Sequence, residues 1–322
     1  MDESNIDLRP ARKAFSRIGL AFCAILVIAT TLQVLWFAIP AAIWGEDNWA
    51  ISSSWGIWIG AFAPLYFIAI PVGLLILRKL PAQAPQDIKL GCGNFFIFLP
   101  ICIFLMYTGN LIGTGLSFLL SGGTAQNAVV DLAMDTNPLK IVVMVILAPL
   151  LEEYVCRKQL IDRTRQYGEK TAVLLSALVF GLLHQNLFQF FYAFGIGLVF
   201  AYIYTRTGRL RYSVVLHAIF NFLGSVLAPW IVSFSESIDP NATTQQQLEA
   251  LPGMLVMLLY ALFLIGMFIA GLVLLIVKCK QLVWKEAAAP LPKGSAAKTV
   301  YLNVGMVLYI LLCIAGFILA LL

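Results

Sequence analysis

The sequence predicts an all-α, polytopic membrane protein, in which about nine transmembrane helices form a single membrane domain over residues 1–322. Two features of the composition predict it: apolar residue types make up 61% of the chain, and charged types make up only 11%. The mean hydropathy of +0.91 agrees. Soluble domains average about 25% charged residues. The composition therefore excludes a soluble enzyme, a secreted disulfide-rich protein and a disordered protein.

Nine apolar runs predict the individual spans, because about 20 helical residues cross the ~30 Å of hydrocarbon in a bilayer. They are expected at 18–39, 54–77, 93–120, 138–156, 171–186, 188–205, 212–233, 252–277 and 300–321. The first run is longer than the apolar region of a signal peptide, about 7–15 residues, so we expect it to remain as a span. The third run is long and rich in glycine, which predicts a kink, and the fifth run is short.

The distribution of basic residues tests this count independently. If the N-terminus is cytoplasmic, nine spans place 20 of the 21 Lys and Arg residues in cytoplasmic segments and leave only Lys140 outside. This bias predicts a cytoplasmic N-terminus and an external C-terminus. Basic residues of a membrane protein report its orientation first, so the net charge of +5 does not indicate a nucleic-acid partner.

Ionisable side chains deep in a span are costly and are by default candidates for function. The chain has two histidines, His184 and His217, and both lie in predicted spans. The fourth span carries Glu152 and Glu153, and Asn221 follows His217 by four residues. At ~1.5 Å per residue, the hairpin of the fourth and fifth spans brings Glu152 and His184 to one height, with His217 at a similar depth. We expect three helices to converge on one site that opens toward the cytoplasm.

The two adjacent glutamates are expected to have different roles. Glu153 and Arg157 are four residues apart, which favours a structural ion pair on one helix face. Glu152 is then left as a carboxylate that could act as a general base on a water molecule held with His184.

The remaining polar residues could serve hydrolysis in two ways. His217 and Asn221 could donate hydrogen bonds to an oxyanion. Alternatively, Glu152, His184 and His217 could hold Zn²⁺ with a water in the fourth position, although the chain has no HExxH motif. The residue types allow a zinc site and a metal-free glutamate mechanism equally. Taken singly, a buried histidine or asparagine usually has a structural role.

Three motifs follow one another on successive predicted helices: Glu152-Glu153-x3-Arg157, Phe180-x3-His184 and His217-x3-Asn221. They resemble the motifs of the CPBP family of intramembrane proteases, also called the Abi or CAAX-protease family, over a core of about 137–225. The resemblance implies a conical helical fold and an endopeptidase in which Glu152 activates a water that His184 positions. It also implies that His217 and Asn221 form the oxyanion side. The ninth span departs from the enzyme type that the motifs resemble.

The expected partner is a membrane-associated peptide or protein substrate that meets the enzyme in the lipid bilayer. The alternative is a non-catalytic membrane immunity or scaffold protein with the same fold, but such a protein need not keep all of these polar residues. A transporter with a Glu/His proton relay is disfavoured, because the ionisable groups lie near one face and no inverted repeat is visible. The sequence leaves open the identity of the substrate, any part played by prenylated CAAX proteins, and the oligomeric state.

Overall fold

The computed structural model describes residues 7–237 and 243–322, and in this part of the chain it contains helices and no strand, which confirms the predicted fold class. The α-helices are α1 (Arg9–Trp44), α2 (Trp49–Ser52), α3 (Ser54–Ala63), α4 (Ile70–Leu77), α5 (Cys92–Ser121), α6 (Ala128–Met134), α7 (Ala148–Glu153), α8 (Leu160–Thr164), α9 (Glu169–Leu183), α10 (Leu187–Thr207), α11 (Leu210–Phe222), α12 (Ala228–Ser233), α13 (Thr244–Cys279) and α14 (Val304–Leu319). Three π-helical turns join neighbouring helices without a break: Pro64–Ala69, Tyr154–Gln159 and Leu223–Leu227. A fourth, Ile141–Leu147, leads directly into α7, and a fifth, Ala297–Tyr301, is separated from α14 by a bend at 302–303.

Each predicted span corresponds to a helical stretch, but the stretches differ in length and polarity. Within the described residues, six have the length and hydropathy of a membrane span: Arg9–Trp44, Ser54–Leu77, Cys92–Ser121, Leu187–Thr207, Leu210–Ser233 and Thr244–Cys279. Helices α9 and α14 have only 15 and 16 residues. At ~1.5 Å per residue they are shorter than the hydrocarbon core is thick. The continuous helix from Ile141 to Thr164 carries the charged residues of the first motif.

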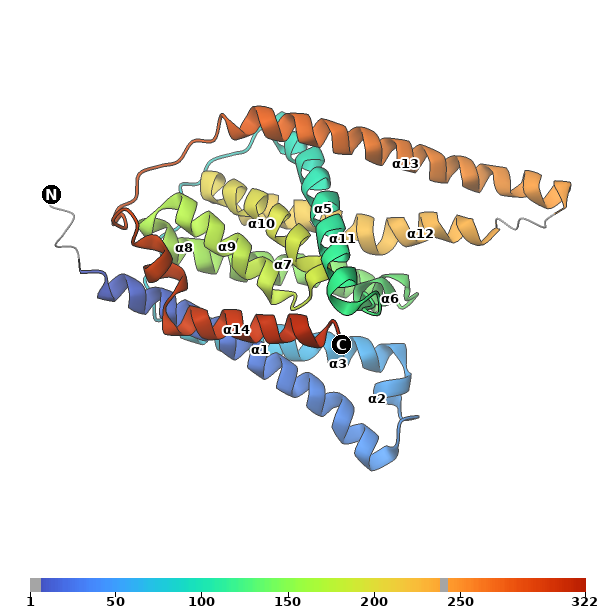
Figure 1. The fold of residues 1–322 in the computed structure, drawn as a ribbon, viewed down its shortest axis with the longest axis horizontal. Helices are drawn as coiled ribbons and strands as arrows, with labels where there is room; N and C mark the ends of the chain where they lie inside the picture. Colours follow the sequence, from blue (N-terminus) through green and yellow to red (C-terminus); the bar gives the residue numbers. More distant parts are fainter. Residues whose placement is uncertain (1–6, 238–242) are drawn as a thin grey trace.

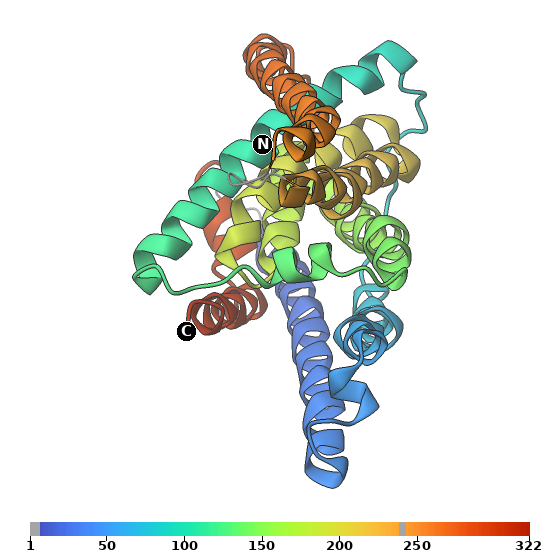
Figure 2. The same cartoon turned by 90° about the vertical axis from the view of Figure 1, so that its right-hand side faces the viewer.

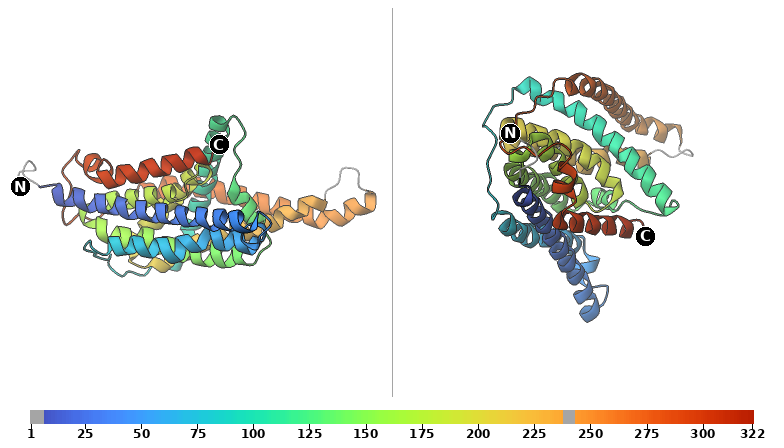
Figure 3. Two further views of the ribbon diagram at one scale, coloured as in Figure 1. Left: turned by 90° about the horizontal axis from the view of Figure 1, so that it is seen from below. Right: turned by 60° about the vertical axis from the view of Figure 1, so that its left-hand side comes forward.

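Most helices run side by side along the long axis of the molecule (Figure 1, Figure 3). Three helices depart from this bundle, in whole or at one end. Helix α5 crosses the other helices at a steep angle, and the ends of α1 and α13 diverge to opposite sides (Figure 2). Gly271, which packs against Pro100 of α5, is the only buried residue among the 36 of α13, and most of the other side chains of this helix are exposed.

The glycines of α5 permit close packing against α10. A Cβ atom on Gly109 would lie 2.4 Å from the backbone nitrogen of Tyr192, and one on Gly113 would lie 2.3 Å from the carbonyl oxygen of Leu187. Helix α5 is continuous from Cys92 to Ser121, so these glycines do not interrupt it. They let two backbones approach, as small residues commonly do between membrane helices.

The segments that carry the basic residues meet at one end of the bundle. Backbone hydrogen bonds join them in pairs, from Gln83 to Asp162 (2.7 Å), from Ile88 to Thr207 (2.8 Å) and from Ala289 to Gln166 (2.8 Å). Glu169, at the start of α9, accepts hydrogen bonds from Arg206 and from the backbone of Lys285 (2.7 Å for Lys285). The chain between α13 and α14 is therefore an ordered strap across this end.

Helix α14 packs against α1 and α9. A Cβ atom on Gly19 or Gly305 would overlap the backbone of the other helix, so both positions need glycine. The hydroxyl of Tyr309 donates a hydrogen bond to the carbonyl of Val179 at 3.0 Å. Helix α14 thus supports the outer side of α9, the helix that ends at His184.

The gathering of basic segments predicts which surface is cytoplasmic. In a variant whose native cysteines are replaced, we expect Thr124→Cys to react with a membrane-impermeant thiol reagent on intact cells. Lys293→Cys, in the strap, should react only after the membrane is opened. Ser117→Cys, at a buried position, serves as the unreactive control. The reverse labelling pattern would contradict the predicted orientation.

Candidate active site

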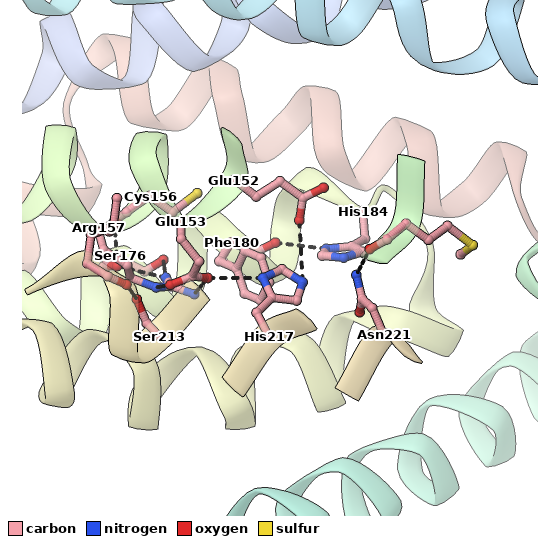
Figure 4. A network of polar contacts seen from close by, with 12 residues as sticks. Glu152, Glu153, Cys156, Arg157, Ser176, Phe180, His184, Ser213, His217 and Asn221 are labelled. Carbon is pink, nitrogen blue, oxygen red and sulfur yellow. Dashed lines mark hydrogen bonds and ion pairs between the residues drawn. The ribbon is translucent and has the colours of Figure 1, made fainter. Parts of the chain in front are cut away.

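The two adjacent glutamates occupy opposite environments. They end α7, where successive side chains point about 100° apart around the helix axis. The side chain of Glu153 is fully buried, whereas that of Glu152 is 20% exposed. Figure 4 shows Glu152 directed toward His184 and His217, while Glu153 is directed toward Arg157. One glutamate is thus accessible to a small molecule and the other is not.

Glu153 and Arg157 form the ion pair that their spacing predicted. The Nε and Nη2 atoms of Arg157 donate to the two carboxylate oxygens of Glu153 at 2.9 and 3.1 Å, and both side chains are fully buried. The Nη1 atom of Arg157 donates to the hydroxyl of Ser176 at 2.9 Å and to its carbonyl at 3.3 Å. The ring of Phe180 lies 4.5 Å from the guanidinium carbon, in cation–π contact. The pair therefore joins the fourth predicted span to α9.

His217, on α11, lies between the two glutamates. Its Nδ1 atom is 3.2 Å from Oε1 of Glu153, and its Nε2 atom is 3.9 Å from Oε2 of Glu152. A carboxylate that receives two bonds from Arg157 is ionised and can only accept, so Nδ1 of His217 carries the proton of this hydrogen bond. The contact with Glu153 fixes the ring and was not predicted from the sequence.

His184 follows the last residue of α9, and its ring is fixed by its own helix. Its Nδ1 atom lies 2.9 Å from the carbonyl oxygen of Phe180. A carbonyl can only accept, so Nδ1 is the donor, and in the neutral ring Nε2 keeps a free lone pair. Within the described residues, no direct hydrogen bond or ion pair joins His184 to Glu152, although the two side chains face each other (Figure 4). In this arrangement a small molecule such as water, bonded to both side chains, could connect His184 with Glu152.

The turn after His184 is conformationally unusual. Gln185 has a φ of 52°, a value in the left-handed region that residues other than glycine seldom adopt. Asn186 then caps α10 by accepting a hydrogen bond from the backbone of Gln189 at 2.8 Å. A Cβ atom on Gly316 of α14 would lie 2.9 Å from the Cβ atom of Gln185, so glycine leaves room for this turn.

Asn221 compensates for a proline in the facing helix. In the π-helical turn Ile141–Leu147 the backbone N–H of Ala148 bonds to Val143, five residues back. The next amide in this register would bond to the carbonyl of Met144, but residue 149 is proline and has no N–H. The Nδ2 atom of Asn221 donates to that carbonyl at 2.7 Å. The sequence predicted Asn221 as an oxyanion donor. In the structure one of its two N–H groups instead bonds to the carbonyl of Met144.

Tyr66 also contacts the predicted site, and the sequence reasoning missed it. It lies in the second predicted span, its side chain is buried, and its hydroxyl donates to Oε1 of Glu152 at 3.1 Å. The hydroxyl of Tyr66 could have indicated a contact of this kind, because a polar group inside a membrane needs a hydrogen-bond partner there. Nothing in the pattern identified Glu152 as that partner.

The predicted alternative of a zinc site is not supported by the arrangement of the side chains. Among the residues that the structure describes, no group of three His, Cys, Asp or Glu side chains is placed to hold a metal ion. Nδ1 of His217 is bonded to Glu153 and Nδ1 of His184 to a carbonyl, so each ring has only its Nε2 atom left for a metal. In the described part of the chain, these two atoms and the carboxylate of Glu152 are not grouped as three ligands of one ion. We therefore derive no step through a metal.

Comparisons with known proteins agree with the motifs. Residues 135–223 match the family described as type II CAAX prenyl endopeptidase Rce1-like. The matched segment contains all three motifs, so the comparison agrees with their resemblance to the CPBP, or CAAX-protease, family. The chain is also 28% identical, over 172 residues, to a Bacillus subtilis (strain 168) protein named "Putative membrane peptidase YdiL". That similarity covers 50% of this chain and 69% of the relative. No solved structure shows significant similarity to the chain.

The buried ion pair predicts how two substitutions differ in stability. Arg157→Ala leaves Glu153 buried without its main partner, and we expect a loss of roughly 3–5 kcal/mol in the free energy of unfolding. Glu152→Gln removes no ion pair with Arg157 and should leave the melting temperature nearly unchanged. Thermal melts of both variants in detergent measure the difference. Equal destabilisation would show that the two glutamates do not divide their roles in this way.

The contact of Asn221 with Met144 predicts coupling to the proline. Asn221→Ala should reduce stability by about 1 kcal/mol, the usual contribution of a hydrogen bond between membrane helices. In a Pro149→Ala background the backbone N–H of residue 149 can bond to Met144, so the same substitution should cost less. Melting temperatures of the two single variants and the double variant complete the cycle. An equal cost in both backgrounds would contradict the proposed compensation.

Proposed function

We propose that this integral membrane protein is an intramembrane endopeptidase that hydrolyses a peptide bond of a membrane-associated substrate with a water activated by Glu152. The single observation that carries the proposal is the contrast between Glu152 and Glu153. Glu153 is buried and bonded to Arg157 and His217, whereas Glu152 is partly exposed and faces two histidines. Two carboxylates in different environments commonly divide acid–base and structural work.

Glu152 and His184 are suited to hold the attacking water. Glu152 offers a carboxylate oxygen as the proton acceptor, and His184 offers the lone pair on Nε2, because its Nδ1 proton is used by Phe180. A water between them would donate one hydrogen bond to each residue, which leaves an oxygen lone pair free for attack. The absence of a direct bond between Glu152 and His184 in the described part of the chain is consistent with this bridging role.

His217 is the proposed donor to the oxyanion. Its Nδ1 proton goes to Glu153, so its Nε2 atom carries a proton only when the ring is an imidazolium. In that state the site contains two carboxylates, one guanidinium and one imidazolium, and its net charge is zero. The second N–H of Asn221 could add a further hydrogen bond, since only one is used by Met144.

The proposed reaction then proceeds in two steps. Glu152 takes a proton from the water as the oxygen adds to the peptide carbonyl, and the negative charge that forms on the carbonyl oxygen is stabilised by His217. Glu152 next gives the proton to the amide nitrogen, and the carbon–nitrogen bond breaks to release an amine and a carboxylic acid. The carboxylate of Glu152 is regenerated without any other reactant.

The comparisons support the proposed substrate class only in outline. The matched family is described by a prenyl endopeptidase activity, and the relative is named as a membrane peptidase. For this chain these similarities support hydrolysis of a peptide bond at the membrane. The small exposed fraction of Glu152 and the apolar surfaces around the helices favour a substrate that reaches the site from the bilayer.

A cleavage assay tests the proposal. The purified protein in lipid nanodiscs is incubated with a library of lipid-anchored peptides, and the products are identified by mass spectrometry. We expect cleavage by the native chain and by Glu286→Gln, an exposed control, and a loss of at least about 100-fold in Glu152→Gln, in the range of a lost general base. The donor geometry predicts that a chelator leaves the rate unchanged. Unchanged cleavage by Glu152→Gln would refute the mechanism, and no cleavage of any peptide by the native chain would favour a non-catalytic protein.

A further inference from the structure

The hydroxyl of Tyr66 contacts Glu152 from outside the segment that matches the CAAX-protease family. Tyr66 lies in the π-helical turn Pro64–Ala69, and the family match begins only at residue 135. Its side chain is 3% exposed, and its hydroxyl lies 3.1 Å from Oε1 of Glu152. Within the described residues, Glu152 is the only hydrogen-bond partner of this hydroxyl.

This hydrogen bond determines which oxygen of Glu152 remains available. An ionised carboxylate can only accept, so the phenol of Tyr66 donates its one proton to Oε1. Oε2 is then the oxygen nearest His217, at 3.9 Å, and it is free of any hydrogen bond within the described part of the chain. A partly exposed carboxylate without such a bond could rotate about its side-chain torsions and exchange its two oxygens.

Tyr66 is itself held firmly. Its ring stacks on that of Phe62 at 6.0 Å, and Phe62 stacks on Trp58 at 5.3 Å. The indole nitrogen of Trp58 donates to Asp135 at 2.7 Å, just before the helical stretch that leads to Glu152. The second predicted span is therefore bonded to the fourth through Glu152, and to the segment just before the fourth through Asp135.

We propose that Tyr66 is a positioning residue for Glu152, which holds the carboxylate so that Oε2 faces the water and the substrate carbonyl. This inference rests on the proposed function. The phenol takes no proton and touches no reacting atom; it acts by fixing the orientation of the general base. Misplacement of a catalytic group by about 1 Å can cost on the order of 100-fold in rate.

Tyr66→Phe tests this role, because it removes the hydroxyl and keeps the ring. We expect kcat to fall by about 10–100-fold while KM stays within about twofold, since orientation affects the chemical step more than substrate binding. The matched control is Tyr204→Phe, which removes another buried hydroxyl that donates to a carboxylate, that of Asp162 at 2.8 Å. Its kcat should stay at the native value.

A purely structural effect is separated by a third variant. Thr164→Val removes a buried hydroxyl that donates to the carbonyl of Leu160 at 2.8 Å and should lower the melting temperature, yet kcat per folded molecule should be retained. The inference is overturned if Tyr66→Phe keeps the native kcat, or if its loss is shared by Tyr204→Phe or by Thr164→Val at equal folded fraction. These outcomes are distinct from failure of the proposed function, which would appear as cleavage by Glu152→Gln.

Discussion

The buried ion pair between Glu153 and Arg157 is the interaction on which the site depends. Two charges placed in the interior of a membrane domain are tolerated only when hydrogen bonds satisfy both of them. Arg157 reaches Ser176 on α9, and Glu153 reaches His217 on α11. The requirement to satisfy one ion pair thus fixes three helices relative to one another. It also aligns the ring of His217 beside Glu152, which is not part of the pair.

A second constraint is that the bilayer offers no water to backbone groups. The helix that carries the glutamates includes π-helical turns and a proline, and each leaves carbonyls with altered partners. The amide of Asn221 satisfies the carbonyl of Met144, so a polar side chain takes the place of a missing backbone donor. Irregular backbone at this depth is sustained by a neighbouring helix, and the same contact fixes the height of α11 beside α7.

The relative height of the site residues along their helices could be predicted from the sequence, whereas rotation about the helix axes could not. Counting residues from the charged ends brought Glu152, His184 and His217 to one level, and the structure brings them together (Figure 4). The count could not show that His217 contacts both glutamates, because the direction of a side chain depends on packing. Each π-helical turn also adds a residue to a helix turn and so changes the facing of every residue that follows.

Contacts between segments that are distant in the chain could not be predicted from the sequence either. The glycines of α5 predicted a kink but allow close approach to α10, and only the facing backbone makes that clear. Tyr66 is separated from Glu152 by 86 positions, and no spacing rule joins the two residues. The ion pair, in contrast, was predictable because its partners are four residues apart on one helix.

The matched family segment contains the chemical groups, but elements outside it hold their orientation. Glu152, His184 and His217 all lie between residues 135 and 223. The hydrogen bond to Glu152 comes from the second predicted span, and the turn after His184 packs against Gly316 of α14. In the mechanism proposed above, general-base catalysis requires close placement of the carboxylate, so residues of this second kind affect the rate without taking part in bond making.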